Sequence, residues 1–382
     1  MKIKEQNKEP LLLEIVTIQN YRSIQDFTID LGRFNIFISA NGSGKSNILE
    51  AIALGASSIS EELEDISLSS RGIKVTEPQF MRAGFDRNNI TKDIKIMFKS
   101  NYGFEYNCIL SNDNSPFSKW FNKSINGTPI TQTLAELYKD DKERSKIQKL
   151  PAEHKMNSLN NFKQLLSNFL IYSPENEILK NFAEGGRKPL GIKGEGFFKL
   201  LKILENDRGK IKKLKEHLEL IDWFKDFSIP QNLLQDEKKI ELKDQYLDPK
   251  LKFFDQKSSN EGFLFLLFYF TLFISEYTPK FFAIDNIDSS LNPKLCSELI
   301  KRLVKLCYEY DKQVIITTHN PAILDGLNLN DEKQRLFVIL RNKPGYTKAL
   351  RITKKQIPDD QLPVRLSEQF LRGYIGGLPK NF

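Results

Sequence analysis

The sequence predicts an α/β fold with a mixed sheet, a β-rich N-terminal lobe, a helical insertion and a second α/β lobe. Three observations support this fold class. Strand-like segments precede the glycine-rich stretch SANGSGKS at residues 39–46, a helical pattern follows it, and a strand–helix–strand unit occupies residues 281–318. A glycine-rich turn between a strand and a helix is typical of phosphate-binding loops. With 382 residues, the chain is long enough for one large domain or two ordinary ones.

The N-terminal lobe is expected at residues 1–110. Its predicted strands alternate apolar and polar side chains or are rich in β-branched residues. They are residues 12–19, 26–31 and 34–38. A helix should begin at about Lys45 and reach Leu54, and residues 93–110 indicate a β-hairpin.

The rest of the chain divides into an insertion at residues 111–250 and a C-terminal lobe at residues 251–382. From about 131 to 225 the pattern is mostly helical and rich in lysine. The C-terminal lobe alternates helices and strands and closes with a hairpin that turns at Pro344-Gly345. The predicted elements are a helix at 262–275, a strand at 281–285, a helix at 293–310, a strand at 313–318 and the hairpin at 335–352.

Composition excludes several classes of protein. The three cysteines lack C-x-x-C spacing and the three histidines are scattered, so neither a disulfide framework nor a zinc site is indicated. The N-terminus has no secretory pattern, and the apolar run at 262–275 has 14 residues, too few for a membrane-spanning helix. We therefore expect a cytoplasmic protein that does not enter a membrane.

The positive charge is concentrated in one segment. The net charge is +8, and residues 186–215 hold ten basic and three acidic side chains. This stretch is either a solvated helical face or a surface that contacts a DNA backbone or an acidic partner.

The glycine-rich stretch differs from the pattern G-x-x-x-x-G-K-[ST] at one position, because Ser39 replaces the first glycine. A serine is small enough for this turn if its φ is negative, so we expect a working loop rather than a plain Gly-Ser turn. Lys45 would reach the β and γ phosphates, and the Ser46 hydroxyl would bind Mg²⁺. The loop residues expected to contact a nucleotide are Asn41, Gly42, Ser43, Gly44, Lys45, Ser46 and Asn47.

The strand FFAID ends in Asp285, at the place where a Walker-B-type carboxylate holds Mg²⁺. An adjacent glutamate normally polarises the attacking water, but this chain has Asn286 there. Asp288 is the nearest carboxylate that could replace it. The alternative is that Asp288 is a turn or helix-capping residue before Asn292-Pro293.

His319 follows the strand QVIITT, 34 residues after Asp285. A strand, helix and strand fit this interval, so the two strands are expected to be parallel neighbours. Ligands bind at the carboxyl ends of such strands, which makes His319 a candidate sensor of the γ-phosphate. A purely structural role is the alternative for an isolated histidine.

These segments together resemble the ABC-type ATPase heads of the SMC and RecF group over residues 11–55 and 255–345. The stretch IQNYRSIQDF is similar to that group's opening strand and gives Arg22 a phosphate contact. The stretch SSNEGF is similar to its signature segment, which contacts ATP bound by the other subunit. The implied signature residues are Ser259, Asn260 and Gly262. The resemblance implies ATP and Mg²⁺ as ligands and a homodimer with ATP between the heads.

Within that group the chain looks most like compact ATPases of bacterial anti-phage operons, relatives of OLD and Septu ATPases. The segment after the last hairpin is too short for the Toprim nuclease domain of OLD proteins, so a separate effector protein is implied. Three functions follow as hypotheses. The chain is a slowly hydrolysing ATPase that times an effector, a scaffold that holds ATP with scarcely any hydrolysis, or a RecF-like repair ATPase that binds DNA.

Overall fold

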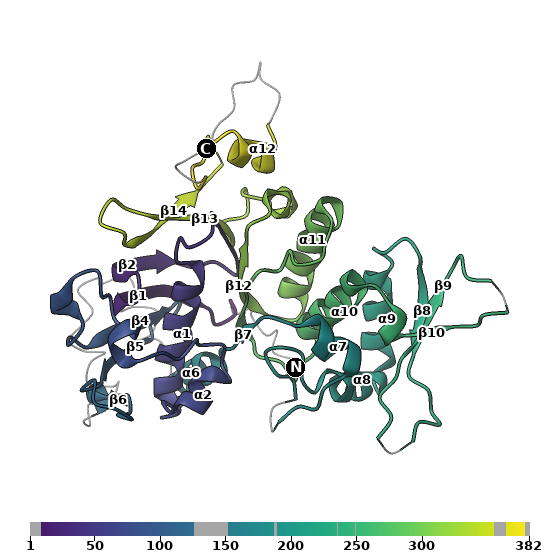
Figure 1. Ribbon diagram of the computed structural model, residues 1–382, viewed down its shortest axis with the longest axis horizontal. Coiled ribbons are helices and arrows are strands. Elements are labelled where there is room, and N and C mark those ends of the chain that lie inside the picture. The colour runs from purple at the N-terminus through teal and green to yellow at the C-terminus, as the bar shows by residue number, and fades with distance from the viewer. Residues whose placement is uncertain are drawn as a thin grey trace, which may run out of the picture.

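The computed structural model describes residues 9–125, 152–186, 189–234, 236–248, 250–354 and 364–378. Its centre is a six-stranded sheet in the order β14-β13-β3-β12-β11-β7 (Figure 1). All neighbours are parallel except β13 and β14, which form the C-terminal hairpin. The strands are β3 (Phe34–Ile38), β7 (Ile171–Tyr172), β11 (Phe281–Ile284), β12 (Gln313–Thr318), β13 (Gln334–Arg341) and β14 (Thr347–Ile352).

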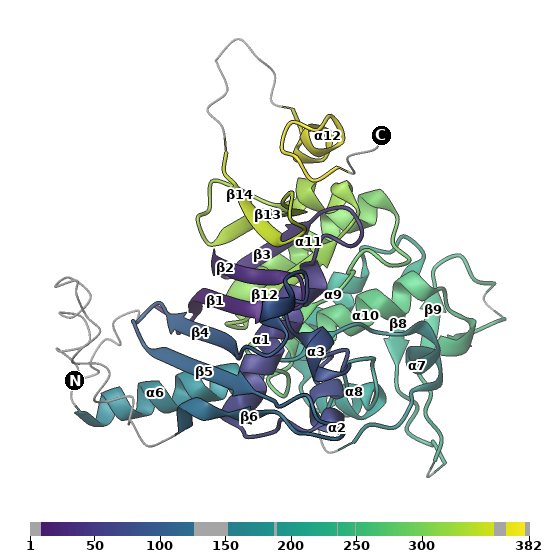
Figure 2. The same cartoon turned by 60° about the vertical axis from the view of Figure 1, so that its left-hand side comes forward.

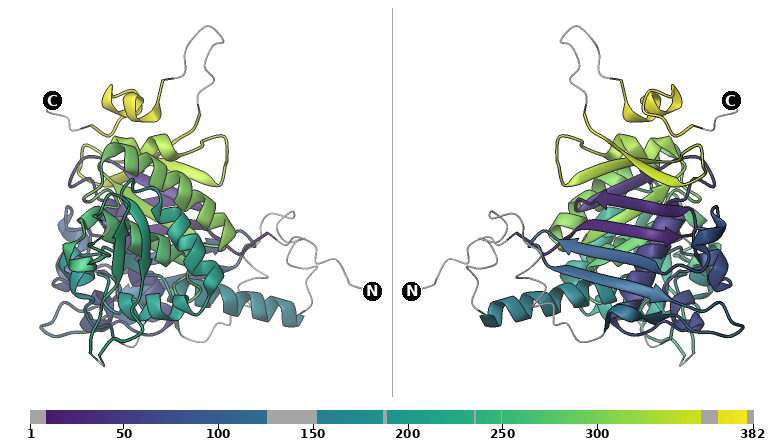
Figure 3. Two further views of the ribbon diagram at one scale, coloured as in Figure 1. Left: turned by 90° about the vertical axis from the view of Figure 1, so that its right-hand side faces the viewer. Right: turned by 90° about the vertical axis from the view of Figure 1, so that its left-hand side faces the viewer.

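A second, antiparallel sheet has the order β2-β1-β4-β5-β6 and is seen at the front of the right-hand view in Figure 3. Helix α1 (Lys45–Ile59) packs against strands of both sheets. A Cβ on Gly55 of this helix would lie 2.7 Å from the Phe98 ring, so the close packing requires glycine. The strands are β1 (Leu13–Tyr21), β2 (Ile24–Asp30), β4 (Ile94–Ser100), β5 (Glu105–Ser111) and β6 (Phe121–Asn122).

The other face of the central sheet is covered by helices, and a small third sheet lies beyond them (Figure 1). Phe34, Ile36 and Ile38 of β3 belong to the core on this face, whereas Phe37 belongs to the core beneath the antiparallel sheet. A strand buried on both faces is typical of parallel sheets. The helices here are α7 (Asn176–Asn181), α8 (Phe197–Glu205), α9 (Arg208–Leu218), α10 (Glu261–Ile274) and α11 (Pro293–Glu309), with strands β8 (Phe224–Ser228), β9 (Glu241–Asp244) and β10 (Phe254–Asp255).

The described residues also form further helices and 3-10 turns. Helix α6 (Ala152–Ser167) packs on α1, and α12 (Leu366–Leu371) lies at the same end of the molecule as β13 and β14 in Figures 1 and 2. The remaining elements are α2 (Asp65–Ser69), α3 (Pro78–Met81) and the 3-10 turns Arg87–Asn89, Lys123–Ile125, Gln256–Ser258 and Pro321–Gly326.

Most of the elements predicted from the sequence are confirmed within a few residues. The apolar run at 262–275 is the core helix α10, whose side chains from Phe263 to Ile274 are all buried. No helix in the described ranges is both long and apolar enough to cross a membrane. The strand β7 and the sheet β8–β10 were not predicted, because they are short and depend on distant partners. Part of the expected helical stretch, residues 131–151, lies outside the described residues.

About half of the described basic residues in the 186–215 stretch form ion pairs with acidic residues of other elements. Lys210 pairs with Glu276 at 3.0 Å, and Lys215 pairs with Asp226 at 2.7 Å. Further pairs join Lys193 to Glu175 and Lys213 to Glu309. Arg187 and Lys188 lie outside the described residues. The described part of this surface therefore carries less unpaired positive charge than its sequence suggests.

Candidate nucleotide site

The loop at residues 39–46 runs from the end of β3, in the middle of the central sheet, into the first turn of α1. Gly42 and Gly44 have φ values of 74° and 108°, which L-residues rarely adopt. A Cβ on Gly44 would also lie 2.1 Å from Thr347 Oγ1. Gly44 is therefore needed both for the turn and for the close approach of the C-terminal hairpin.

Ser39, which replaces the usual first glycine, fits the turn without a positive φ. Its side chain is buried and contacts the Ser43 hydroxyl. Its Oγ also accepts a hydrogen bond from Lys45 Nζ at 3.0 Å. The expectation that a serine can be accommodated here is confirmed by this backbone geometry.

Lys45 and His319 meet beside the loop. The Nζ of Lys45 lies 3.1 Å from Nε2 of His319, while Nδ1 of His319 lies 2.8 Å from the Ser39 carbonyl oxygen. Because a carbonyl only accepts, Nδ1–H is the donor, and the Nε2 lone pair faces the ammonium group. Desolvation lowers the pKa of His319, and the Lys45 charge lowers it further. His319 is therefore neutral near pH 7.

Burial lowers the pKa of Lys45 to about 8, although the negative charges of Asp285 and Asp288 oppose this shift. The Lys45 ammonium contacts the carbonyl and hydroxyl oxygens of Ser39 and the His319 ring, and it forms no ion pair with a carboxylate of the described residues. A buried cation whose contacts are all with neutral groups is arranged to receive an anionic ligand.

Asp285 and Ser46 lie next to each other on the same edge of the sheet. The Ser46 hydroxyl donates to Asp285 Oδ2 at 3.1 Å, and the Thr317 hydroxyl donates to Asp285 Oδ1. One hydroxyl and one carboxylate from adjacent elements are hard oxygen donors of the type that Mg²⁺ prefers, together with substrate phosphates and waters. These residues therefore fit an Mg²⁺ ion that is bound together with a nucleotide.

The segment after β11 explains why asparagine occupies position 286. Asn286 has φ 54°, in the left-handed region that asparagine tolerates better than glutamate does. Its N–H donates to Thr317 Oγ1 at 2.9 Å, and its side chain is exposed. Asp288 is half-buried, and its Oδ1 accepts from Thr318 Oγ1 at 2.6 Å. Asp288 is also close enough for its charge to raise the pKa of Lys45.

Arg22 lies beside the loop but is held by α1. Its Nη2 lies 3.0 Å from Glu50 Oε2 and also donates to the Lys74 carbonyl, and its Nε donates to the Tyr21 hydroxyl at 3.3 Å. Burial raises the pKa of Glu50, and the Arg22 charge opposes that rise. Arg22 also borders a cavity that Asn47 of α1 lines.

The signature-like residues lie at the N-terminus of α10. Asn260 caps this helix by accepting from Phe263 N at 2.8 Å, and Ser259 faces inward, where its hydroxyl donates to the Gln256 carbonyl. A Cβ on Gly262 would lie 3.3 Å from the Ser290 carbonyl oxygen. These contacts join the segment to the turn after Asp285 rather than to the phosphate loop of the same chain.

Sequence reasoning missed several residues that support the site. Thr317 and Thr318 orient the two aspartates, and Thr347 donates to the Ser43 carbonyl at 3.1 Å. The Ala40 N–H donates to the Gly377 carbonyl at 3.1 Å, so the C-terminal segment contacts the loop. The Thr-Thr pair directly before His319 was a usable signal, whereas nothing local marks Thr347 or Gly377.

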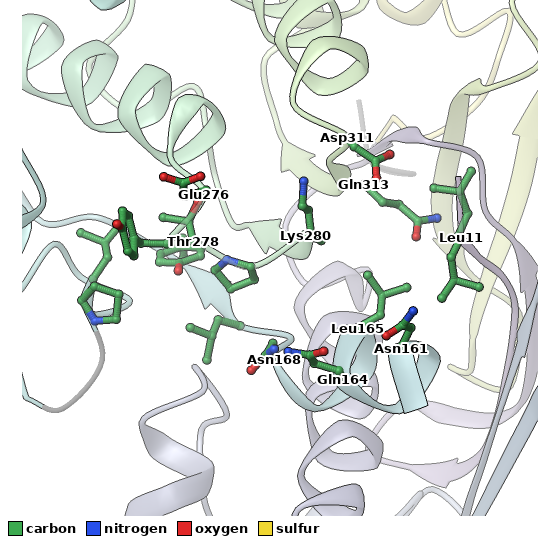
Figure 4. A pocket seen from close by; sticks show the side chains of 17 residues that line it. Leu11, Asn161, Gln164, Leu165, Asn168, Glu276, Thr278, Lys280, Asp311 and Gln313 are labelled. Carbon is green, nitrogen blue, oxygen red and sulfur yellow. The ribbon is translucent and has the colours of Figure 1, made fainter. Parts of the chain in front are cut away.

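A cavity of about 530 Å³ lies at the opposite edge of the central sheet (Figure 4). Lys280, directly before β11, and Gln313, the first residue of β12, line it together with Asn161 and Gln164 of α6. Gln313 uses its amide to bind the backbones of Leu13 and Gly32. Because Asp285 and His319 follow the other ends of the same strands, this cavity is not part of the phosphate site.

Comparison with known proteins identifies related sequences and folds. A family model described as an AAA domain matches residues 16–252, and a second, described as "AAA domain, putative AbiEii toxin, Type IV TA system", matches residues 197–325. No curated protein matches the chain. The chain is similar to a solved SMC head bound to the C-winged helix domain of ScpA, with 13% identity and a TM-score of 0.57 over 90% of this chain and 98% of that one.

A second similar structure is the SMC head domain with an extended coiled coil from Pyrococcus furiosus, bound to the C-terminal domain of ScpA. It is 14% identical, with a TM-score of 0.51 over 90% of this chain and 96% of that one. At these identities the likeness establishes the fold. The chain has the fold of an SMC-type ATPase head, as its sequence motifs predicted.

Proposed function

This chain belongs to the AAA-domain family, and we propose that it binds ATP with Mg²⁺, hydrolyses it slowly, and works as a dimeric switch for a separate effector protein. One observation carries the proposal. Lys45, Ser46, Asp285 and His319 come from three different strand ends or helix starts and lie together beside a glycine turn. That arrangement provides a cation, hard oxygen ligands and backbone N–H groups for a triphosphate.

Each residue has a separate proposed role. The backbone N–H groups from Asn41 to Asn47 and the Lys45 ammonium bind the β and γ phosphates. Ser46 and Asp285 hold Mg²⁺, which when bound neutralises the charge that develops on the phosphates. His319 faces the γ-phosphate with Nε2, since its Nδ1–H is occupied by the Ser39 carbonyl. The negative charge of a bound phosphate favours the imidazolium form, in which Nε2 also carries a proton and donates to a phosphate oxygen.

Asp288 is the proposed base that takes a proton from the attacking water. Asn286 orients that water without accepting its proton. The 2.6 Å bond from Thr318 holds the Asp288 carboxylate and leaves its second oxygen for the water. Turnover is expected to be slow because the carboxylate acts from two positions beyond its usual place.

The proposed dimer places the signature segment of one chain over the nucleotide of the other. Asn260, at the N-terminus of α10, and Ser290, in the turn after β11, are both exposed. Glu261 joins the two places, because it accepts from both Asn176 Nδ2 and Ser290 Oγ at 2.6 Å. These hydrogen bonds hold the signature segment and the turn after β11 together as one surface. Arg22 would contact the phosphates once its ion pair with Glu50 is replaced by an ion pair with a phosphate group.

The effector is proposed to be a separate protein. The similar SMC heads were solved with ScpA bound, which is a separate chain, and the family description for residues 197–325 names a putative AbiEii toxin. The ScpA complexes support a separate partner protein, and the description as a putative toxin of a Type IV TA system supports a role in anti-phage defence. The RecF-like alternative receives less support, because the lysines of α9 are paired with acidic side chains.

Calorimetric titration of Mg²⁺-ATP into the Lys45→Ala variant tests the phosphate site. We expect ATP affinity to be lost, because the loop's only buried ammonium group is removed. Lys294→Ala, which changes an exposed lysine on α11, is the matched control and should bind normally. Unchanged ATP affinity in Lys45→Ala would contradict the proposal.

Light scattering with a non-hydrolysable ATP analogue tests the dimer. Wild-type mass should double with the analogue, and Gly262→Gln should stay monomeric because a side chain at the second position of α10 obstructs the partner. Gly209→Gln makes the same change at the second position of α9 and should dimerise normally. An unchanged mass with the analogue would count against assembly driven by ATP, and a dimer present in both samples would indicate constitutive assembly.

A further inference from the structure

We infer that the cavity bordered by Phe80 and Phe85 binds the nucleobase of the nucleotide by stacking. This inference rests on the proposed function, since it assigns the base position for the same ligand. The segment involved, residues 78–90, carries no recognisable motif and lies between α1 and β4 in the sequence. It contains α3 and a 3-10 turn.

The cavity has the size and lining of a small-molecule site. Its volume is about 370 Å³, and ligand pockets typically measure about 300–1,000 Å³ with aromatic walls and a few polar groups. The residues that line it are Arg22, Ser23, Asn47, Gln79, Phe80, Arg82, Gly84, Phe85, Ile90 and Arg341. Among these described residues there is no carboxylate, so nothing there repels a nucleotide.

Two phenylalanine rings remain unusually open at this cavity. The side chains of Phe80 and Phe85 are 64% and 52% exposed. Leaving two large apolar side chains in water beside one concavity is unfavourable, and such patches commonly mark binding sites. A planar base would cover these rings, and stacking on an aromatic face is available to every base.

The cavity is joined to the phosphate loop through two residues. Asn47 follows Ser46 directly in α1, so it lies where the chain leaves the phosphate-binding turn. Arg341 donates through Nε to the Gly42 carbonyl at 2.7 Å, and its guanidinium lies over the Phe85 ring, 5.5 Å from the centroid. One wall of the cavity is therefore attached to the loop itself.

The Phe85 ring is held in a fixed orientation. Tyr346, in the turn between β13 and β14, contacts it edge-on, with the ring centroids 5.6 Å apart. Arg341 covers it from another side. A preorganised ring loses little conformational freedom when a ligand stacks on it. Phe80, from the short helix α3, has no such ring partner among the described residues and is the more exposed of the two.

The test compares Mg²⁺-ATP with Mg²⁺-tripolyphosphate, which has the phosphates but no base. Dissociation constants are measured by calorimetry for wild type, Phe80→Ala and Phe85→Ala. We expect wild type to bind ATP more tightly than tripolyphosphate, and each variant to lose ATP affinity by about 5- to 150-fold, the range that stacking on one aromatic ring contributes. Tripolyphosphate affinity should stay unchanged, which also shows that the loop remains folded.

Phe121→Ala is the matched control, because Phe121 is also 52% exposed but belongs to β6. It should bind both ligands as wild type does. Equal wild-type affinity for ATP and tripolyphosphate would overturn the base site and leave the phosphate site standing. Variants that lose affinity for both ligands alike, or for neither, would also overturn it. A wild-type protein that binds neither ligand would refute the proposed function together with this inference.

Discussion

Replacing Asp288 with asparagine should slow ATP hydrolysis sharply while leaving ATP binding intact. The substitution keeps the size of the side chain and an oxygen that can accept the 2.6 Å hydrogen bond from Thr318 Oγ1. The half-buried position should therefore remain well packed. Only the negative charge and the ability to take a proton are removed.

The magnitude follows from the proposed role. Assistance by a general base typically accelerates a reaction by about 10² to 10⁴-fold, which corresponds to about 2.7–5.5 kcal/mol of activation free energy. Turnover in Asp288→Asn should fall by at least the lower of these factors. A smaller contribution comes from Lys45, whose pKa falls further when the Asp288 charge no longer supports its protonated form.

The reciprocal variant Asn286→Glu restores the usual glutamate and should change turnover only modestly. Its backbone is left-handed, with φ 54°, and a glutamate there costs about 1–2 kcal/mol more than in an ordinary conformation. If no base exists in the wild type, the pattern reverses. Asn286→Glu would then raise turnover, and Asp288→Asn would have little effect.

The assay is steady-state phosphate release, with ATP affinity measured separately so that binding and chemistry are distinguished. Asp285→Asn is a control that should weaken Mg²⁺-dependent binding as well as turnover, since Asp285 contacts Ser46 directly. Wild-type turnover in Asp288→Asn would show that Asp288 is not the base. If Asn286→Glu also hydrolyses ATP at the wild-type rate, the assignment of this strand end is wrong.

Raising the pH through about 8 should weaken ATP binding, because Lys45 then loses its proton, and calorimetry in buffers of different protonation enthalpy should detect proton uptake that Lys45→Arg abolishes. Because the ordinary lysine pKa is 10.5, the unfolded chain binds more protons than the folded one between pH 8 and 10.5. The free energy of unfolding of the ligand-free protein should therefore rise with pH over that range, as the cost of burying the Lys45 charge disappears, and denaturant unfolding should show this rise in wild type but not in Lys45→Met. Gly44→Ala should cost about 1–3 kcal/mol of unfolding free energy or distort the loop, given the 2.1 Å approach to Thr347; an unchanged melting curve and ATP affinity would contradict this. DNA binding measured by fluorescence anisotropy should be weak at physiological salt, because the lysines of α9 are ion-paired; tight binding with a steep salt dependence would favour the RecF-like alternative.

The sequence by itself determined the parts of this protein that short, local patterns specify. The turn before Lys45 needs glycines at positive φ, and glycines at those positions are visible in the sequence. Asp285 and His319 could be assigned to neighbouring strand ends because an apolar strand, a helix and an apolar strand separate them. The buried helix α10 was predicted because an apolar run of 14 residues is too short for a membrane and too apolar for a surface.

Only the tertiary structure decided which distant residues complete the site. Thr347 and Gly377 reach the phosphate loop from more than 300 positions away, through contacts that no local pattern encodes. The strands β8–β10 are short, and a short strand is specified by its partners rather than by its own residues. The charge of α9 likewise depends on acids from other elements. Propensity acts between neighbours in the chain, whereas pairing, burial and charge compensation act between neighbours in space.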